Sequence, residues 1–238
     1  MKIEGKNAVT ECISSGKTIE KIIIQNGIDA KNIIDLARDR GIKIQFANKS
    51  ALDDLSVTKK HQGIIALTSD FVYSSVEDIL QLSKQKSQPA FILILDGIED
   101  PHNLGSIIRV AECAGVDGII IPKDRAVGVN ETVVKVSAGA TERVKVAKVV
   151  NLNRTIEDLK KQNIFVYAAD MDGDTMYQTN LKGDIALIIG SEGFGVSKLT
   201  RKLADGIISI PMYGKINSLN ASVSAGVVVY EIIRQRSF

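Results

Sequence analysis

The sequence contains little that would mark a disulfide-stabilised, metal-clustered or membrane-spanning protein. Its 238 residues include two cysteines, Cys12 and Cys113, too few for a disulfide framework or a cysteine-rich metal site. The apolar runs FILIL and GIIIP are too short to cross a bilayer, and MKIEGKNAVTE lacks the apolar core of a signal peptide. We therefore expect a protein without metal or membrane segment, located in the reducing cytoplasm.

Nucleotide-binding signatures are also missing. No G-x-x-x-x-G-K-[ST] pattern occurs, and the glycine-rich GSEGFG has the order G-x-x-G-x-G instead of the dinucleotide order G-x-G-x-x-G. NAD and ATP are therefore poorly supported. The formal net charge is +2, so a surface for a polyanionic partner must come from local clustering of Lys and Arg.

The order of expected elements indicates two α/β domains. Residues 1–72 alternate short helices with the strands KIIIQ, IKIQF and GIIALT. Residues 73–89 combine a short helix with a polar, proline-terminated tail and are the predicted linker. In residues 90–238, apolar strands without clean alternation are separated by helices, which predicts a mostly parallel sheet covered on both faces.

Three strands of the second domain end in loops of unusual content. FILILD leads into GIEDPHNLGSIIR, DIALIIG into SEGFGVS, and GIISIP into MYGKINSLNAS. Ligands bind at the carboxyl ends of strands in such sheets, so we expect the loops to meet at one edge. Each loop also has an ordinary interpretation: Asn103 suits a helix N-cap, GSEGFG a tight turn, and Ser218 and Asn220 the start of the last helix.

Two features go beyond those interpretations. Arg109 has apolar neighbours in its helix, and a charge near a core needs a partner: a ligand anion, or a salt bridge to Glu112 or Glu192. The small residues of ASVSAG in the last helix predict close packing against a ligand, another backbone segment or a partner subunit.

Together, DPHNLGSIIR, LIIGSEGFGVS and ISIPMYGKINSLNASVSAGVVVYE resemble the three motifs of the SPOUT superfamily, in its TrmH-type branch of RNA ribose 2′-O-methyltransferases. In the first domain, EGKNAVTE and KKHQGIIA resemble the ribosomal-protein-like substrate-binding domain of 23S ribosomal RNA guanosine 2′-O-methyltransferases. Short tRNA-modifying relatives lack this domain, so its presence favours ribosomal RNA.

The resemblance implies a deep trefoil knot in the C-terminal sheet, S-adenosylmethionine bound among the knotted loops, and an obligate homodimer whose active sites borrow residues from the partner. It implies cofactor contacts at Gly190, Gly193, Ile210, Met212 and Leu219, and a catalytic set of Asn103, Arg109, Glu192, Ser218 and Asn220.

Methyl transfer to a ribose hydroxyl requires that hydroxyl to lose its proton. A guanidinium is essentially always protonated, so we expect Arg109 to bind a phosphate and stabilise the alkoxide, oriented by Glu192 and Asn103, instead of acting as a base. His102 is a candidate proton acceptor, although a loop histidine on the substrate face is the simpler interpretation. Candidate RNA contacts are Lys6, Lys59, Lys60, His61, Lys123, Arg125 and Arg143.

The resemblance therefore implies methyl transfer from S-adenosylmethionine to a ribose 2′-hydroxyl of RNA, most simply a guanosine of 23S ribosomal RNA. One alternative keeps the chemistry but modifies tRNA or another ribosomal nucleoside. A non-catalytic RNA-binding assembly factor is a second alternative, although all three motifs retain their polar residues. Without the motifs, the α/β pattern would have suggested a nucleotide-binding oxidoreductase.

Overall fold

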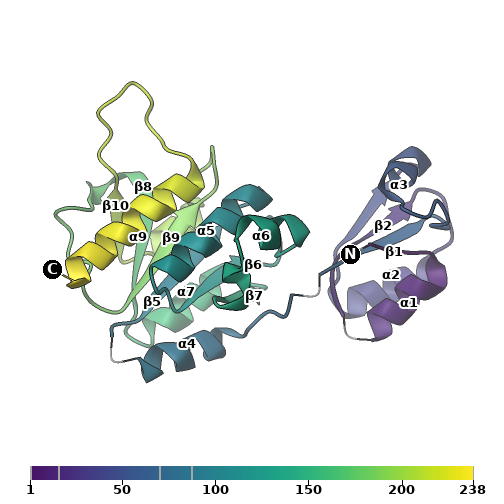
Figure 1. Ribbon diagram of the computed structural model, residues 1–238, viewed down its shortest axis with the longest axis horizontal. Helices are drawn as coiled ribbons and strands as arrows, with labels where there is room; N and C mark the ends of the chain where they lie inside the picture. Colours follow the sequence, from purple (N-terminus) through teal and green to yellow (C-terminus); the bar gives the residue numbers. More distant parts are fainter. Residues whose placement is uncertain (1, 16, 70, 87, 238) are drawn as a thin grey trace. The chain divides into compact units, whose positions relative to one another are not determined.

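The computed structural model describes residues 2–15, 17–69, 71–86 and 88–237. The chain separates into two compact units, Met1–Val72 and Tyr73–Phe238, each with its own sheet and core (Figure 1). Within the described ranges, no helix is both long and apolar enough to span a membrane.

The first unit is a mixed sheet with the strand order β1-β4-β2-β3. Its elements are β1 (Lys2–Glu4), α1 (Lys6–Ser14), β2 (Thr18–Gln25), α2 (Lys31–Asp39), β3 (Ile44–Ala47), α3 (Lys49–Leu55) and β4 (Ile64–Ser69). Strands β1 and β2 are antiparallel to β4, whereas β2 and β3 are parallel. Strand β1 and helix α3 were not predicted; the three residues of β1 are too few for a periodic pattern.

Alternation along β2 explains how helices cover both faces of this sheet. Ile22 and Ile24 point to one face, where they pack with α1 and α2 through residues such as Val9 and Ile33. Ile23 points to the other face, where Leu52 of α3 covers it. The first unit therefore has an apolar core on each side of its sheet.

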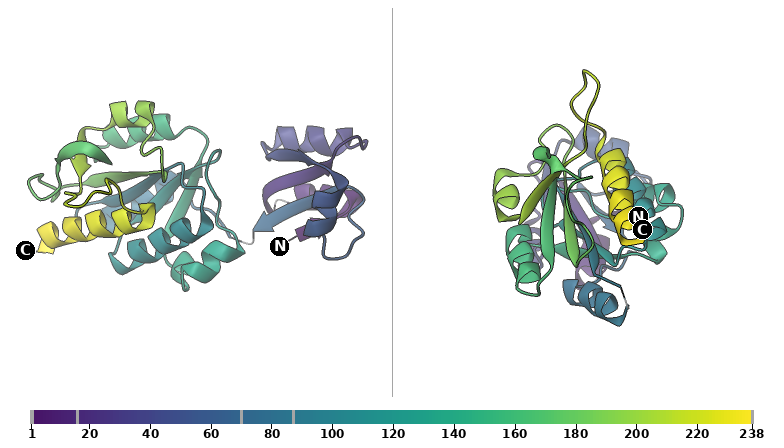
Figure 2. Two further views of the ribbon diagram at one scale, coloured as in Figure 1. Left: turned by 90° about the horizontal axis from the view of Figure 1, so that it is seen from above. Right: turned by 90° about the vertical axis from the view of Figure 1, so that its left-hand side faces the viewer.

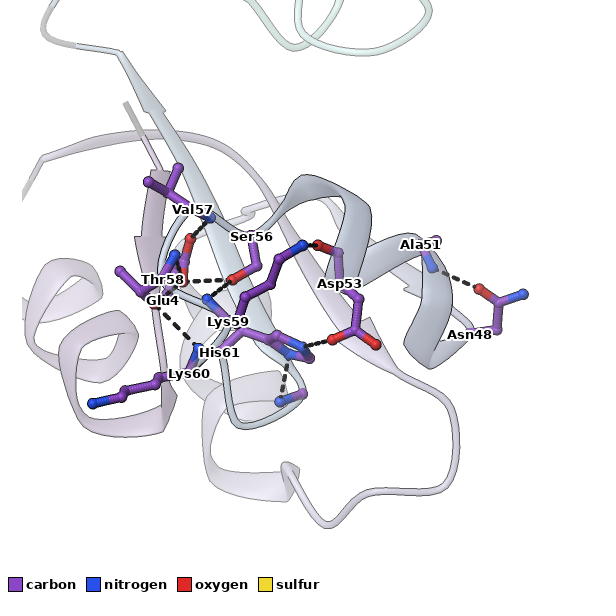
Figure 3. Close-up of polar contacts among 11 residues, drawn as sticks. Glu4, Asn48, Ala51, Asp53, Ser56, Val57, Thr58, Lys59, Lys60 and His61 are labelled. Carbon is purple, nitrogen blue, oxygen red and sulfur yellow. Dashed lines mark hydrogen bonds and ion pairs between the residues drawn. The ribbon is translucent and has the colours of Figure 1, made fainter.

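Glu4, at the end of β1, fastens the loop 56–63 (Figure 3). Its carboxylate accepts hydrogen bonds from Ser56 Oγ at 2.8 Å, from Val57 N at 2.6 Å, and from both the backbone N–H and the hydroxyl of Thr58. Desolvation raises the pKa of Glu4, but the hydrogen bonds from Thr58, Val57 and Ser56 outweigh it and lower the pKa from 4.5 to about 2. The loop is thus tied to the sheet by an ionised carboxylate.

The second unit is a parallel sheet with the strand order β10-β8-β9-β5-β6-β7, in which every pairing among the described residues is parallel. The strands are β5 (Phe91–Asp96), β6 (Gly118–Pro122), β7 (Lys145–Val149), β8 (Phe165–Thr175), β9 (Ile185–Gly190) and β10 (Gly206–Ser209). The helices are α4 (Val76–Gln85), α5 (Pro101–Cys113), α6 (Glu131–Val136), α7 (Leu152–Lys160), α8 (Lys198–Leu203) and α9 (Ala221–Ser237), with a 3-10 turn at Ala140–Glu142. The predicted α/β fold with a mostly parallel C-terminal sheet is confirmed; the knot stays a prediction.

Helices cover both faces of the sheet, with the yellow α9 on one face and the green α7 on the other (Figure 2). On the α7 face, Ile79 of α4 and Ile156 of α7 join one apolar cluster with Ile94 and Ile188 of the central strands. On the opposite face, α5 packs against both α6 and α9. Strands buried on both faces explain the continuous apolar runs in the sequence.

Two predicted features of this unit differ in the structure. Helix α5 begins at Pro101, and its N-cap is Asp100, whose carboxylate accepts a hydrogen bond from His102 N, so the N-cap assignment of Asn103 is wrong. The predicted linker 73–89 belongs to the second unit, because α4 packs against β7 and Lys86 pairs with Asp117 at 2.6 Å. The polar sequence of this segment gave no indication of these contacts.

The last helix is anchored by polar side chains near its end. Gln235 donates to the carbonyls of Met176 and Thr179 and accepts from Leu181 N. Arg236 donates to the carbonyls of Pro89, Ala90 and Gly183, next to the first residues of β5 and β9. These bonds hold α9 in place along the sheet.

We predict that Glu4→Gln loosens the loop 56–63, because an amide cannot accept the charge-assisted hydrogen bonds from Thr58 and Val57. Hydrogen-exchange protection at Val57 and Thr58 should fall at neutral pH. In the unsubstituted protein the pKa is lowered on folding, so the stabilisation is full above about 4.5 and is lost as the pH falls towards about 2. In Glu4→Gln that acid-induced loss of protection should disappear. Exposed Glu11 supplies the control, Glu11→Gln, and equal protection in both variants would contradict the anchoring role.

Candidate functional site

The site is built on the pairing of the two central strands, β5 and β9. Their register places Asp96, the last residue of β5, opposite Gly190, the last residue of β9. Asp96 Oδ2 also accepts a hydrogen bond from Ser197 N at 2.9 Å, across the end of the glycine-rich loop. The loops that follow β5 and β9 are therefore held side by side.

The glycine-rich loop is a closed turn. Ser191 and Gly195 exchange backbone hydrogen bonds of 3.1 and 3.0 Å. Gly193 and Gly195 have φ angles of 93° and 65°, in the region that glycine occupies without strain. A Cβ at Gly190 would overlap the backbone of Gly195 and Val196, so the close return of the turn requires glycine there.

Glu192, exposed on this turn, joins the other two loops. Its Oε2 accepts hydrogen bonds from Asn103 Nδ2 at 3.3 Å and from Asn220 Nδ2 at 3.4 Å. Asn103 is 6% exposed, whereas Asn220 caps α9 by accepting from the backbone N–H and hydroxyl of Ser222. The expectation that the three loops meet at one sheet edge is confirmed for these three residues.

Arg109 and Ser218 are not part of this group. Arg109 follows Asn103 by six residues, which turns it by about 240° around the helix axis, and its side chain is exposed. The salt bridge of Arg109 to Glu112 or Glu192, one of the two alternatives that the sequence left open, is absent among the described residues, because Glu112 pairs with Arg143 and Glu192 binds the two amides. Neither Glu192 nor Asn103 therefore orients Arg109 within one chain.

The third loop, residues 211–220, projects from the body before α9 (Figure 1). Ser218 is exposed in it, and Met212 and Leu219 expose 38% and 37% of their surface. Ile210, just before the loop, is half-buried. At Gly193 a Cβ would meet nothing within 4 Å, which leaves its backbone accessible. Exposed apolar side chains and accessible backbone are the kinds of group that suit the adenosine part of a cofactor.

The small residues at the start of α9 have a partner within the chain. Helix α9 packs along α5, and a Cβ at Gly226 would lie 3.9 Å from Val110 Cγ2. Val223 and Tyr230, three residues before and four residues after Gly226, lie on the same stripe of α9 and are each about half exposed.

A cavity of about 680 Å³ opens at the carboxyl ends of β5, β6, β7 and β9, and Asn103 and Glu192 line one side of it. Its other walls include Asp96, Glu99, Asp124, Arg125, Asn153 and Phe194. Most of these residues were missed from the sequence, although KDR directly after GIIIP repeats the signal of a polar loop after a buried strand. Across the described ranges, no cluster of His, Cys, Asp and Glu is arranged to hold a metal ion.

The predicted RNA contacts differ in whether their charged groups are exposed and whether they already have a partner within the chain. Lys6 Nζ donates to Asp29 O and Lys59 Nζ to Asp53 O, while Lys60 is exposed (Figure 3). His61 is buried, with Nε2 2.9 Å from Asp53 Oδ1 and Nδ1 accepting from Gly63 N, so its expected phosphate contact is wrong. In the second unit, Arg125 and Arg143 are exposed and Lys123 is half-buried.

A parallel α/β sheet with polar loops converging at the carboxyl ends of its strands is typical of ligand-binding α/β proteins. Comparison with known proteins identifies which one: residues 90–230 match the SpoU rRNA methylase family, and the chain belongs to that family. Residues 2–74 match the RNA 2′-O ribose methyltransferase substrate-binding domain. We therefore class the chain as an RNA 2′-O-methyltransferase.

Individual relatives are similar to this chain over nearly its whole length. The TrmH family protein YacO of Bacillus subtilis strain 168 is 43% identical over 238 residues, which cover 98% of this chain and 95% of that protein. The fold is similar to the SpoU methyltransferase AviRb from Streptomyces viridochromogenes, solved in complex with AdoMet, with a TM-score of 0.64, 22% identity and coverage of 100% and 90% of the two chains. An RNA 2′-O ribose methyltransferase crystal structure gives a TM-score of 0.59 at 25% identity, covering 100% of this chain and 89% of the other.

We predict that Gly190→Ala opens the glycine-rich turn, because the new methyl group overlaps the returning backbone. Forced overpacking of this kind should lower the free energy of unfolding by roughly 1–3 kcal/mol, measurable by urea denaturation. Gly183→Ala is the matched control, since a Cβ there meets nothing within 4 Å. Equal stability of the two variants would contradict the constraint.

Proposed function

We propose that the protein transfers a methyl group from S-adenosylmethionine to the ribose 2′-hydroxyl of a guanosine in 23S ribosomal RNA. The observation that carries this proposal is the Glu192 carboxylate, which unites all three motif loops through Asn103 and Asn220. The match of residues 2–74 to a substrate-binding domain supports ribosomal RNA, and the two-cysteine composition supports a cytoplasmic location. The cofactor in the AviRb complex supports S-adenosylmethionine.

We assign the cofactor to the glycine turn and the third loop, at Gly190, Gly193, Ile210, Met212 and Leu219. When bound, S-adenosylmethionine supplies an electrophilic methyl group on a positively charged sulfur. Glu192 keeps the amides of Asn103 and Asn220 fixed, so both remain oriented when the ribose enters. Exposed His102, in the first turn of α5, is the candidate proton acceptor for the 2′-hydroxyl, and Ser218 lies exposed on the third loop.

Arg109 enters the proposal through a second copy of the chain. It is exposed, turned away from Asn103, and without an ion pair among the described residues. A free guanidinium suits a phosphate or a developing alkoxide. We propose a homodimer in which the partner's Arg109 completes each site, with the exposed side of α9 around Val223 and Tyr230 as the contact.

In the first unit we propose that RNA meets the loop 56–63, where Lys60 offers an unshielded charge (Figure 3). Lys6 and Lys59 would contribute positive potential while their amines bind carbonyls. Lys123, Arg125 and Arg143 would contact phosphates on the second unit.

The reaction is tested with methyl-labelled S-adenosylmethionine and, in separate incubations, unmodified 23S ribosomal RNA and total tRNA. We expect label in 2′-O-methylguanosine from 23S RNA, identified after digestion to nucleosides. Arg109→Lys should reduce turnover by roughly tenfold or more, because a lysine offers a point charge instead of a planar fork. Label found only in tRNA would mean that tRNA, and not 23S ribosomal RNA, is the substrate. Cofactor binding without any labelled product would favour the assembly-factor alternative.

The shared site is tested by complementation. Arg109→Ala and Glu192→Ala should each abolish transfer, whereas co-expression of both chains should restore about a quarter of the activity, since half of random dimers would carry one intact site of two. Co-expression of Arg109→Ala with Arg109→Lys is the control without complementing positions. Failure of the first pair to recover activity would place Arg109 and Glu192 in the same chain's site.

A further inference from the structure

The cavity at the ends of β5, β6, β7 and β9 is not explained by cofactor binding. None of the five residues assigned to the cofactor lines it, yet Asn103 and Glu192 of the proposed catalytic group do. Its volume of about 680 Å³ lies in the ordinary range for small-molecule sites and is large enough for a nucleoside. If the ribose reacts at Asn103 and Glu192, as proposed, a cavity lined by these two residues lies where the attached base would go.

The cavity presents hydrogen-bond acceptors. Three of its carboxylates are occupied: Asp96 accepts from Ser197 N, Asp100 from His102 N, and Glu192 from the amides of Asn103 and Asn220. Glu99 and Asp124 are exposed and have no hydrogen bond or ion pair among the described residues. Buried Asn103 adds another acceptor: its Nδ2 binds Glu192, and its Oδ1 has no partner in the described part of the chain.

This acceptor set distinguishes the four bases. Guanine carries two adjacent donors, N1–H and the N2 amino group, on its Watson–Crick edge, and a carboxylate accepts two parallel hydrogen bonds. Adenine and cytosine present an acceptor beside their amino group, and uracil places one N–H between two carbonyls. These acceptors would face the negative charge of Glu99 or Asp124.

Two further wall residues complete a nucleotide site. Phe194 is 94% exposed, which suits a ring that stacks on a base. Arg125 is exposed and holds a positive φ of 55°, a conformation that costs energy for a residue with a side chain. Its guanidinium offers a charge for the phosphate of the same nucleotide.

We infer that this cavity binds the guanine base of the target nucleotide, with Glu99 and Asp124 accepting its N1–H and N2 amino hydrogens and Phe194 stacking on its ring. The inference rests on the proposed function and adds a base-reading site to it.

The test measures binding of guanosine, inosine and adenosine 5′-monophosphates to the full-length protein by calorimetry or ligand-observed NMR. Guanosine monophosphate should bind roughly tenfold or more tightly than inosine monophosphate, which lacks the N2 amino group, and than adenosine monophosphate. The variant Glu99→Gln/Asp124→Asn should lose this preference and bind guanosine monophosphate more weakly. If only the overall charge mattered, this variant would bind guanosine monophosphate more tightly, because removing two negative charges favours an anionic ligand.

The control Asp54→Asn/Glu157→Gln removes the same charges from exposed positions outside the cavity and should leave the preference intact. The inference is overturned by equal binding of the three nucleotides, by guanosine monophosphate binding that is undetectable up to about 10 mM, or by unchanged or stronger binding in the cavity variant. It is also overturned if that variant loses affinity for S-adenosylmethionine, which would assign the cavity to the cofactor.

The outcomes separate this inference from the proposed function. Labelled methyl groups on a nucleoside other than guanosine would overturn the base site and leave the methyl transfer standing. Selective guanosine monophosphate binding without methyl transfer to any RNA would leave the base site and overturn the reaction.

Discussion

The parallel pairing of β5 with β9 is the constraint on which the rest of the site depends. Because Asp96 lies opposite Gly190, the chain leaves both strands at the same level of the sheet. The bond from Ser197 to Asp96 then closes the glycine turn over the end of β5, and the absence of a side chain at Gly190 permits its close return. A shift of one residue would point alternate side chains to the opposite face and separate Glu192 from Asn103.

Glu192 links the loops at this shared edge through hydrogen bonds to Asn103 and Asn220. An exposed carboxylate that holds two amides, one buried on α5 and one capping α9, links the first and last helices of the site. The same arrangement leaves Arg109 outside, on a different side of α5. This position of Arg109 supports the proposed dimer, in which it would act at the site of the partner.

The two units hold polar loops in place by different means. In the first unit, Glu4 is ionised and saturated with donors, so the loop 56–63 keeps its shape while Lys60 stays exposed. In the second unit, strand register and glycine do the same for the loops at the sheet edge. In both units the exposed charges lie on loops whose backbone is held in place by the sheet. A loop that is already ordered loses less entropy when a ligand binds.

The sequence by itself determined the parallel sheet, the two α/β units and the meeting of three polar loops, because continuous apolar strands alternating with helices leave one edge for the loops that follow them. Strand β1 was invisible, since its three residues carry no period, and α3 was missed as well. The N-cap at Asp100 was missed because Asp100 and Asn103 are both good caps, and only backbone conformation separates them. The tertiary structure alone decided that Asn103 faces Glu192 while Arg109 does not, that His61 is buried, and that a cavity opens beside the site. Each of these depends on which side chains distant segments bring together, and no local pattern records that.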